Sequence, residues 1–314
     1  MNRFEDNPEL PQDPAHNTDL SSNAGPSVND HSPEPLTVPP LHPDASQLTE
    51  PPLVVGRVYP EDLQTSWSWP HLILFLLYSF VSLIFIQGTL VLFYAPKQKG
   101  MTSKQLEQYL ISKPQFAIGS MLLWYAAIFF FLYVTLSILR GKPFWRSLGW
   151  RKIKPFSEGT LPRNPLVYVF TGCGLSLFVA ILSSRLKTPE NLPVEELFKY
   201  RQTALLFMAM AVFVAPLVEE TLFRGYLYPL FARSFGVTPA IFVTGILFGL
   251  MHGYQLGWTW TLVTVLIVVG IIFTLVRART GSVFASYLMH LGYNSLIAIA
   301  ALLGTHGFTQ MPKH

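Results

Sequence analysis

The stretch FVAPLVEETLFRGYLY, residues 213–228, places two adjacent carboxylates, Glu219 and Glu220, directly after an apolar run of membrane character. An ionised side chain near the middle of a bilayer costs at least about 2.5 kcal/mol. Ionisable groups are therefore rare at that depth and indicate a functional site or a buried partner. Two questions follow: what surrounds the acidic pair, and what does the pair do?

The composition outside this stretch indicates a membrane protein. Of 314 residues, 50% are hydrophobic and only 13% are charged, which is too apolar for an ordinary soluble domain. A spanning helix needs about 20 apolar residues, and no alternating ten-residue pattern suggests a β-barrel. We therefore predict an all-α, polytopic helical membrane bundle of about seven transmembrane helices, the fifth being short and shielded by its neighbours. The apolar segments are 71–95, 115–139, 165–183, 204–218, 239–251, 258–276 and 282–303.

The N-terminal region differs in composition from the rest. Residues 1–64 hold 12 of the 25 prolines and 11 of the 18 acidic residues, and such a segment buries too little surface to offset its ordering entropy. We predict a disordered, Pro-rich acidic tail over 1–64, N-terminal transmembrane helices over 65–200 and a core over 201–303 that carries the acidic pair. The single cysteine excludes an intramolecular disulfide.

Basic residues suggest an orientation. With the N-terminus inside, the inner segments hold 13 Lys and Arg and the outer ones nine, which favours a cytoplasmic N-terminus. The densest cluster, RGKPFWRSLGWRKIK at 140–154, falls on the inner side. We expect these cations to face anionic membrane lipids. No basic stripe interleaved with aromatics points to nucleic acid.

The turn SFGVTP, residues 234–239, brings a glutamate and a histidine to one depth. If the helices on either side run antiparallel, residues equally far from the turn lie at the same level. Glu219 and His252 have their midpoint at about 235.5, inside this turn, and each lies about 25 Å up its helix. We therefore predict that they face one another.

Two features complicate this geometry. The run 204–235 would be about 48 Å long as one helix, so we expect it to kink at Pro216 or Pro229 or to project into the cytoplasm. His290 and Asn294 lie one turn apart on one face of the last helix. Counting from their own turn puts them nearer the cytoplasm than the acidic pair, and helix tilt or the proline bend has to close this gap.

The two glutamates have different neighbours along the helix. Arg224 follows Glu220 by four residues, so the two can pair on one face. Glu219 is rotated by about 100° from Glu220 and has no such partner. Glu220 is the predicted structural ion-pair member, and Glu219 is the free carboxylate suited to general-base chemistry.

Several functions are compatible with these residues taken singly. A lone membrane histidine is often a packing residue, a Glu–Arg pair is usually structural, and an asparagine can join two helices. Together they predict a catalytic or transport site. A proton-coupled transporter would be expected to show an internal repeat, and none is found. A non-catalytic scaffold remains the alternative to an enzyme.

Three motifs carry a resemblance to a known family. EETLFR, with Glu219, Glu220 and Arg224, resembles the EExxxR motif of the CAAX protease and bacteriocin-processing (CPBP, or Abi) family of intramembrane proteases. FGLMH resembles its FxxxH motif, with Phe248 and His252, and HLGYN resembles its HxxxN/D motif, with His290 and Asn294. The three motifs occur in family order within residues 200–301.

The resemblance implies an intramembrane endopeptidase of the CAAX-processing type, which hydrolyses a peptide bond near the cytoplasmic membrane face. Its helices would enclose a conical cavity open to the cytoplasm. Glu219 and His252 would activate a water, and His290 and Asn294 would stabilise the oxyanion. The remaining motif residues would shape the site, namely Glu220, Arg224 and Phe248.

Metal dependence stays open at this point. The family is widely labelled as metalloprotease, yet this chain has no HExxH motif. Glu219, His252 and His290 are the set that would hold Zn²⁺ with an open position. We favour a metal-free glutamate mechanism, because an asparagine suits oxyanion binding better than zinc binding, and we keep zinc as the alternative.

The resemblance also bears on substrate and location. It implies a bacterial-type member in the inner (cytoplasmic) membrane, acting on a peptide or a membrane-anchored protein, with prenylated proteins among the candidates. Some members act in bacteriocin immunity or scaffolding, so a non-catalytic role that keeps the motif residues for structure is the alternative function.

Overall fold

The structure is a computed structural model that describes residues 59–94, 100–102, 105–106, 109–110, 113–153, 164–185 and 192–308. Most of the predicted tail, residues 1–58, lies outside the described residues. The end of that predicted tail is packed, because the 3₁₀-helix η2 (Glu61–Leu63) buries Leu63. The predicted boundary at residue 64 therefore falls inside a folded segment, which charge and proline content alone did not separate from the tail.

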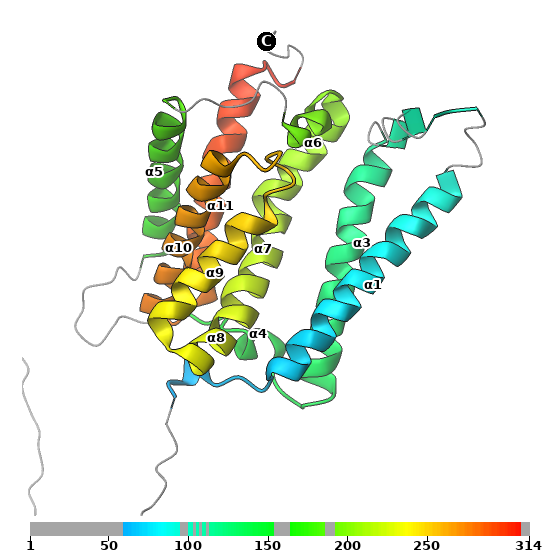
Figure 1. Cartoon of the computed structure of the whole chain (residues 1–314). Coiled ribbons are helices and arrows are strands. Elements are labelled where there is room, and N and C mark those ends of the chain that lie inside the picture. The colour runs from blue at the N-terminus through cyan, green and yellow to red at the C-terminus, as the bar shows by residue number, and fades with distance from the viewer. Residues whose placement is uncertain are drawn as a thin grey trace, which may run out of the picture. The chain divides into compact units, whose positions relative to one another are not determined.

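The described residues contain helices and no strand (Figure 1). The all-α prediction is confirmed. The elements of the N-terminal part, in chain order after η2, are α1 (Trp69–Tyr94), α3 (Pro114–Leu132), the π-helix η4 (Tyr133–Ile138), α4 (Phe144–Ser147), α5 (Pro165–Ser183) and the 3₁₀-helix η5 (Pro193–Phe198). The C-terminal elements are α6 (Arg201–Ala209), η6 (Met210–Val214), α7 (Ala215–Glu219), η7 (Glu220–Leu227), α8 (Tyr228–Phe235), α9 (Val237–Met251), α10 (Trp260–Thr280) and α11 (Val283–Gly304).

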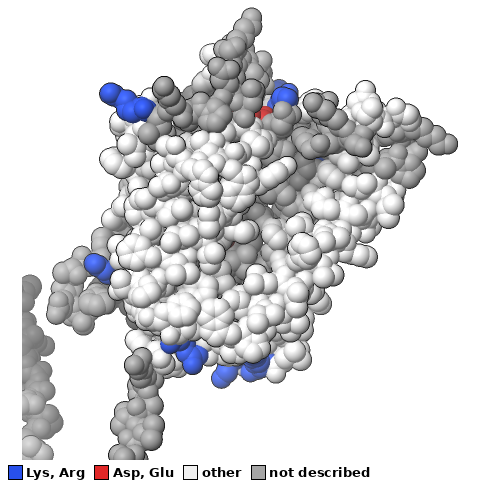
Figure 2. All heavy atoms as spheres, in the orientation of Figure 1, with Lys and Arg blue, Asp and Glu red and all other residues white. Residues whose placement is uncertain are grey.

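Six of these helical runs are long and apolar enough to cross a membrane. The predicted fifth segment corresponds to α9, which has 15 residues and is shorter than the six. The prediction of a polytopic membrane bundle is confirmed, and so is the short fifth helix. Figure 2 shows the consequence at the surface, a broad uncharged face with Lys and Arg confined to its rims.

The run 201–235 is one continuous helical path with two changes of winding. The π-helices η6 and η7 end shortly before Pro216 and Pro229, respectively. Proline lacks an N–H donor, and its ring clashes with the carbonyl four residues earlier. A wider π turn just ahead of the ring accommodates this clash, and such turns are frequent at functional sites. The disturbance predicted at the two prolines thus takes the form of π-helical turns.

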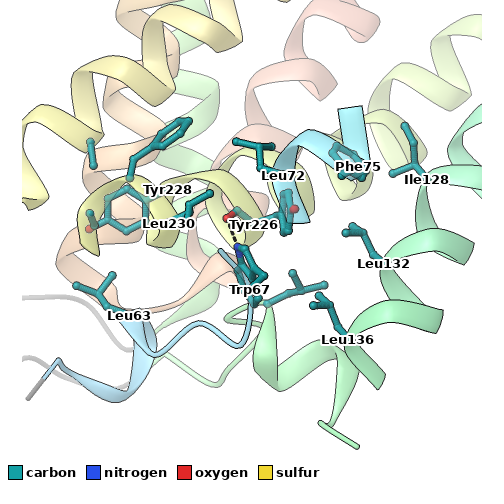
Figure 3. Packing of buried hydrophobic residues seen from close by; sticks show 14 of the residues in the cluster. Leu63, Trp67, Leu72, Phe75, Ile128, Leu132, Leu136, Tyr226, Tyr228 and Leu230 are labelled. Carbon is teal, nitrogen blue, oxygen red and sulfur yellow. Dashed lines mark hydrogen bonds between the residues drawn. The ribbon is translucent and has the colours of Figure 1, made fainter. Parts of the chain in front are cut away.

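The helix pair α1 and α3 is joined to η7 by an aromatic cluster (Figure 3). Trp67 stacks on Tyr226 with 5.2 Å between ring centroids, and its indole N–H donates to the Tyr226 carbonyl at 3.1 Å. His71 Nδ1 lies 2.6 Å from the Tyr226 hydroxyl. Leu132 and Leu136 are fully buried in the same cluster. These contacts hold the C-terminal part of η7, at Tyr226, against Trp67 and the start of α1.

Close helix approach at glycines positions the two histidine-bearing segments. A Cβ added at Gly172 of α5 would lie 1.9 Å from the Met289 carbonyl oxygen of α11. Additions at Gly245 or Gly249 of α9 would collide with the α10 backbone at Ile271 and Ile267. Small residues allow such backbone contact between membrane helices. This close packing holds in place the helix that bears His290, α11, and the helix that precedes His252, α9.

The bundle has two distinct ends. At the first, which we call the basic end, the start of α1, the 140–153 segment and the α10–α11 turn meet. Arg277 pairs with Asp62 at 3.0 Å, and the Ser282 hydroxyl donates to the Arg151 carbonyl at 2.6 Å. At the opposite end, η5, the 252–259 turn and residues 304–308 meet: Val194 donates to the Gln255 carbonyl, and Phe198 stacks on Phe308 with 5.6 Å between ring centroids.

Candidate active site

The Glu220–Arg224 pair lies fully buried next to the candidate site. Arg224 Nη1 donates to Glu220 Oε1 at 2.8 Å, and both side chains are completely buried. The predicted ion pair is confirmed. Arg224 also donates from Nε to the Thr274 hydroxyl at 3.2 Å and from Nη2 to the Gly270 carbonyl at 2.8 Å. Such extra hydrogen bonds offset the desolvation of a buried charge pair.

Aromatic rings enclose the same guanidinium. Its carbon lies 4.5 Å from the ring centroid of Phe248, 5.5 Å from that of Phe273 and 5.8 Å from that of Phe223. Aromatic faces attract a cation electrostatically, most strongly where water is excluded. Phe248 was among the predicted support residues. Phe223 and Phe273 were missed, although Phe223 lies inside the EETLFR stretch itself.

His290 lies between the two glutamates. Its Nδ1 is 3.0 Å from Glu220 Oε1, and its Nε2 is 3.8 Å from Glu219 Oε2. The side chain is only 5% exposed. The gap in depth expected from counting along the helices is therefore closed. The contact with Glu220 was not predicted, because helix phase says nothing about which carboxylate a neighbouring helix meets.

Glu219 and His252 lie opposite one another, as the hairpin count predicted. Glu219 Oε2 is 3.9 Å from His252 Nε2, and each side chain is about one-fifth exposed (19% and 20%). His252 Nδ1 is 2.8 Å from the Phe248 carbonyl oxygen, to which it can only donate. One carboxylate oxygen thus faces the Nε2 atoms of two imidazoles, at distances longer than a direct hydrogen bond.

Asn294 is held by the π-helix η6. Its Nδ2 donates to the Ala211 carbonyl at 2.8 Å. An amide nitrogen carries two N–H donors, so one remains for another acceptor. Glu219, His252, His290 and Asn294 therefore lie together, brought from three helical segments to one place.

Comparison with known protein families finds a match, which covers the segment that carries these residues. Residues 201–296 match the family described as Rce1-like, type II CAAX prenyl endopeptidase Rce1-like. This segment is an Rce1-like domain. It contains all seven predicted site residues, and the resemblance drawn from the three motifs is confirmed over its length. No curated protein and no solved structure matched the chain.

The Rce1-like domain does not form the cavity alone. The four polar side chains line a cavity of about 320 Å³ whose walls are mainly apolar. Met121 and Tyr125 of α3 contribute to its wall from outside the domain. Tyr125 was missed by sequence reasoning, because nothing in its apolar surroundings singles it out.

The cavity extends from Glu219 toward the opposite end of the bundle. Val194 and Phe198 of η5 and Gln255 of the 252–259 turn line it, and these residues lie away from the basic end. The sequence predicted both a cytoplasmic N-terminus and a cavity open to the cytoplasm. Since the start of α1 lies at the basic end, these two predictions place opposite ends of the Rce1-like domain in the cytoplasm and exclude one another.

The fit of a metal ion can be judged from the same geometry. Within the described ranges, no group of three or more His, Cys, Asp or Glu side chains is arranged to hold a metal ion. The set considered for zinc, Glu219, His252 and His290, therefore does not form a ready metal site in the Rce1-like domain.

Proposed function

We propose that this protein is an intramembrane endopeptidase of the CAAX-processing type, which hydrolyses a peptide bond in a peptide or a membrane-anchored protein. The observation that carries the proposal is one carboxylate, Glu219, facing the Nε2 atoms of His252 and His290 across gaps of 3.9 and 3.8 Å. The match of residues 201–296 to a family of CAAX prenyl endopeptidases supports the same reaction class.

The contacts favour a water molecule as the nucleophile. With Nδ1 of His252 donating to a carbonyl and Nδ1 of His290 facing Glu220, a neutral imidazole has an acceptor at Nε2. Two acceptors, Glu219 Oε2 and the Nε2 of a neutral His252, then face one another across 3.9 Å, while a doubly protonated His290 presents an N–H at its Nε2. A water that donates to both acceptors satisfies this arrangement and lies where a general base could take its proton.

The remaining steps follow from the same groups. Glu219, oriented with His252, takes a proton as the water attacks the carbonyl carbon of the scissile bond. Asn294 donates its second N–H to the oxyanion of the tetrahedral intermediate. His290 joins as a second donor in its doubly protonated form, with Glu220 as counter-ion. The proton held by Glu219 then passes to the leaving amine.

The test compares the wild-type protein with Glu219→Gln and His252→Ala, purified in detergent. Each is incubated with a prenylated CAAX peptide and with a mixed peptide library, with and without a zinc chelator. We expect cleavage by the wild type alone, unaffected by the chelator, because glutamine cannot accept the proton of water. Loss on chelation that zinc restores would establish a metal mechanism. Equal cleavage by all three would refute the site, and no cleavage by any would favour the non-catalytic scaffold.

Orientation belongs to the same proposal. We propose a cytoplasmic N-terminus because the inner segments carry more Lys and Arg, so that the cavity extends toward the outer face. Single cysteines at Lys152 and Ser184, in a Cys173→Ser background, can be labelled in intact cells with an impermeant maleimide. We expect labelling at position 184 only. Labelling at position 152 only would place the cavity toward the cytoplasm, as the family resemblance implies.

A further inference from the structure

The basic end holds a second pocket, remote from the cavity of Glu219. It has a volume of about 500 Å³ and lies between the segment that precedes α1 and the segment around α4. We call it the basic basin. Its lining includes Glu61, Ser66, Lys142, Arg146 and Arg151.

The basic basin has an excess of positive charge. Its three cations, Lys142, Arg146 and Arg151, face a single carboxylate. Glu61 is held by Arg146 at 2.7 Å and by Arg151 at 3.1 Å, so its charge is compensated within the basin. Two positive charges remain in excess, and anionic groups with several oxygens are the preferred ligands of such clusters.

Two polar atoms in residues that line the basin are left without a hydrogen bond. Among the described residues, Ser66 Oγ and Arg151 Nε are buried atoms that make no hydrogen bond. Buried polar groups are nearly always hydrogen-bonded, and an exception calls for a bound water or ion. Both atoms belong to residues that line the basin. A phosphate group has several acceptor oxygens for the charged donors of Lys142, Arg146 and Arg151, which line the basin.

The level of the basin relative to the membrane indicates where that phosphate comes from. Trp69 and Trp145 are exposed large side chains at this end of the bundle (42% and 48%). Tryptophan is enriched at the level of lipid headgroups, and α1 begins at Trp69. We propose that the basic basin binds the phosphate group of an anionic membrane lipid.

Occupation of the basin would support the helix that bears the site. Both of its walls rest on η7, because Trp67 stacks on Tyr226 (Figure 3) and the Trp150 indole donates to the Thr221 hydroxyl at 3.1 Å. A phosphate that bridges the two walls holds them together against η7. Because a ligand that binds only the folded state stabilises it, lipid binding raises the thermal midpoint.

The test uses the full chain in an uncharged detergent. Its thermal midpoint is measured against increasing phosphatidylglycerol, phosphatidylcholine or inorganic phosphate. We expect a saturable rise with phosphatidylglycerol and none with the other two. A rise of the same size with inorganic phosphate would assign the basin to free phosphate and overturn the lipid proposal. A flat response to phosphatidylglycerol would also overturn it.

Two variants and a control locate the effect. Lys142→Gln removes one exposed charge and leaves the Glu61 ion pairs intact, and Arg146→Gln removes a second charge. Each should raise the half-saturating lipid concentration about five-fold, the worth of one basic residue near an anionic surface. Arg279→Gln removes an exposed cation near the same end but outside the basin, and should leave this concentration unchanged. An equal effect of Arg279→Gln would show general charge attraction in place of a site.

Discussion

Two sides of one helical run differ in almost every physical respect. On the closed side, Glu220 and Arg224 are completely buried, and Arg224 donates three hydrogen bonds within an aromatic enclosure. On the open side, Glu219 lines a cavity, is about one-fifth exposed, and has its nearest imidazole nitrogens 3.8 and 3.9 Å away. The two carboxylates are neighbours in sequence.

The contrast shows how a membrane protein can hold a carboxylate beside a cavity within its helices. Breaking a buried ion pair is strongly destabilising, so the closed side fixes the helix and the rotation of each side chain on it. With that frame in place, the adjacent carboxylate can remain uncompensated beside the cavity. In the proposed mechanism, stability and reactivity are thus divided between Glu220 and Glu219, and each prediction below tests one side of this division.

The largest effect is expected on the closed side. Arg224→Leu leaves the Glu220 carboxylate buried without its partner and should cost about 3–5 kcal/mol of unfolding free energy. Thermal unfolding in detergent measures this loss. Adding Glu220→Gln removes the stranded charge and should recover part of the stability. A single variant as stable as the wild type would show that the pair does not support the helix.

Next in size is a loss of activity on the open side. Asn294→Ala removes the donor proposed to stabilise the oxyanion and should lower kcat about 100- to 1,000-fold. Its hydrogen bond to the Ala211 carbonyl is lost as well, so the unfolding free energy should fall by about 1 kcal/mol. Peptide cleavage and thermal unfolding, measured on one preparation, separate the two. Ser295→Ala, one residue further along α11, is the control and should change neither by much.

A smaller effect is expected where η7 meets the 140–153 segment. A Cβ on Gly225 would lie 2.6 Å from the Leu148 carbonyl oxygen, and overpacking of this kind costs about 1–3 kcal/mol. Gly225→Ala should therefore lower the thermal midpoint. Gly174→Ala on α5 is the matched control, because nothing lies within 4 Å of its added Cβ, and it should be neutral or slightly stabilising. Equal midpoints for the two variants would contradict this close contact.

The sequence predicts what depends on regular helix geometry. Segment lengths place the spanning helices, the 235.5 midpoint brings Glu219 opposite His252, and the spacing of four residues pairs Glu220 with Arg224. Contacts between helices that are distant in sequence could not be predicted in this way. The Gly270 carbonyl reaches Arg224 across 46 positions, and only the packing of α10 decides this.

The N-terminal helices show the same limit. Tyr125 lies in an apolar segment where any aromatic residue would serve for lipid contact, so its place in the cavity wall depends on how α3 leans on the Rce1-like domain. Asp62 likewise lies in a segment assigned to the tail, yet it pairs with the buried Arg277. Charge patterning describes a segment by itself and does not reveal the surface on which it packs.

The smallest expected effect concerns Tyr125, which lines the cavity from outside the Rce1-like domain. Tyr125→Phe removes only a hydroxyl group from a residue of α3 that lines the same cavity as Glu219. If the hydroxyl helps to hold the carboxylate or its water, kcat should fall up to about ten-fold, which corresponds to one hydrogen bond of about 1.4 kcal/mol. The ring and its packing are kept, so the thermal midpoint should stay the same. Tyr133→Phe, at an exposed position in η4, is the matched control. A fall in kcat for Tyr125→Phe alone would make the site a joint product of the Rce1-like domain and the helices before it, whereas unchanged kinetics would confine the chemistry to residues 201–296.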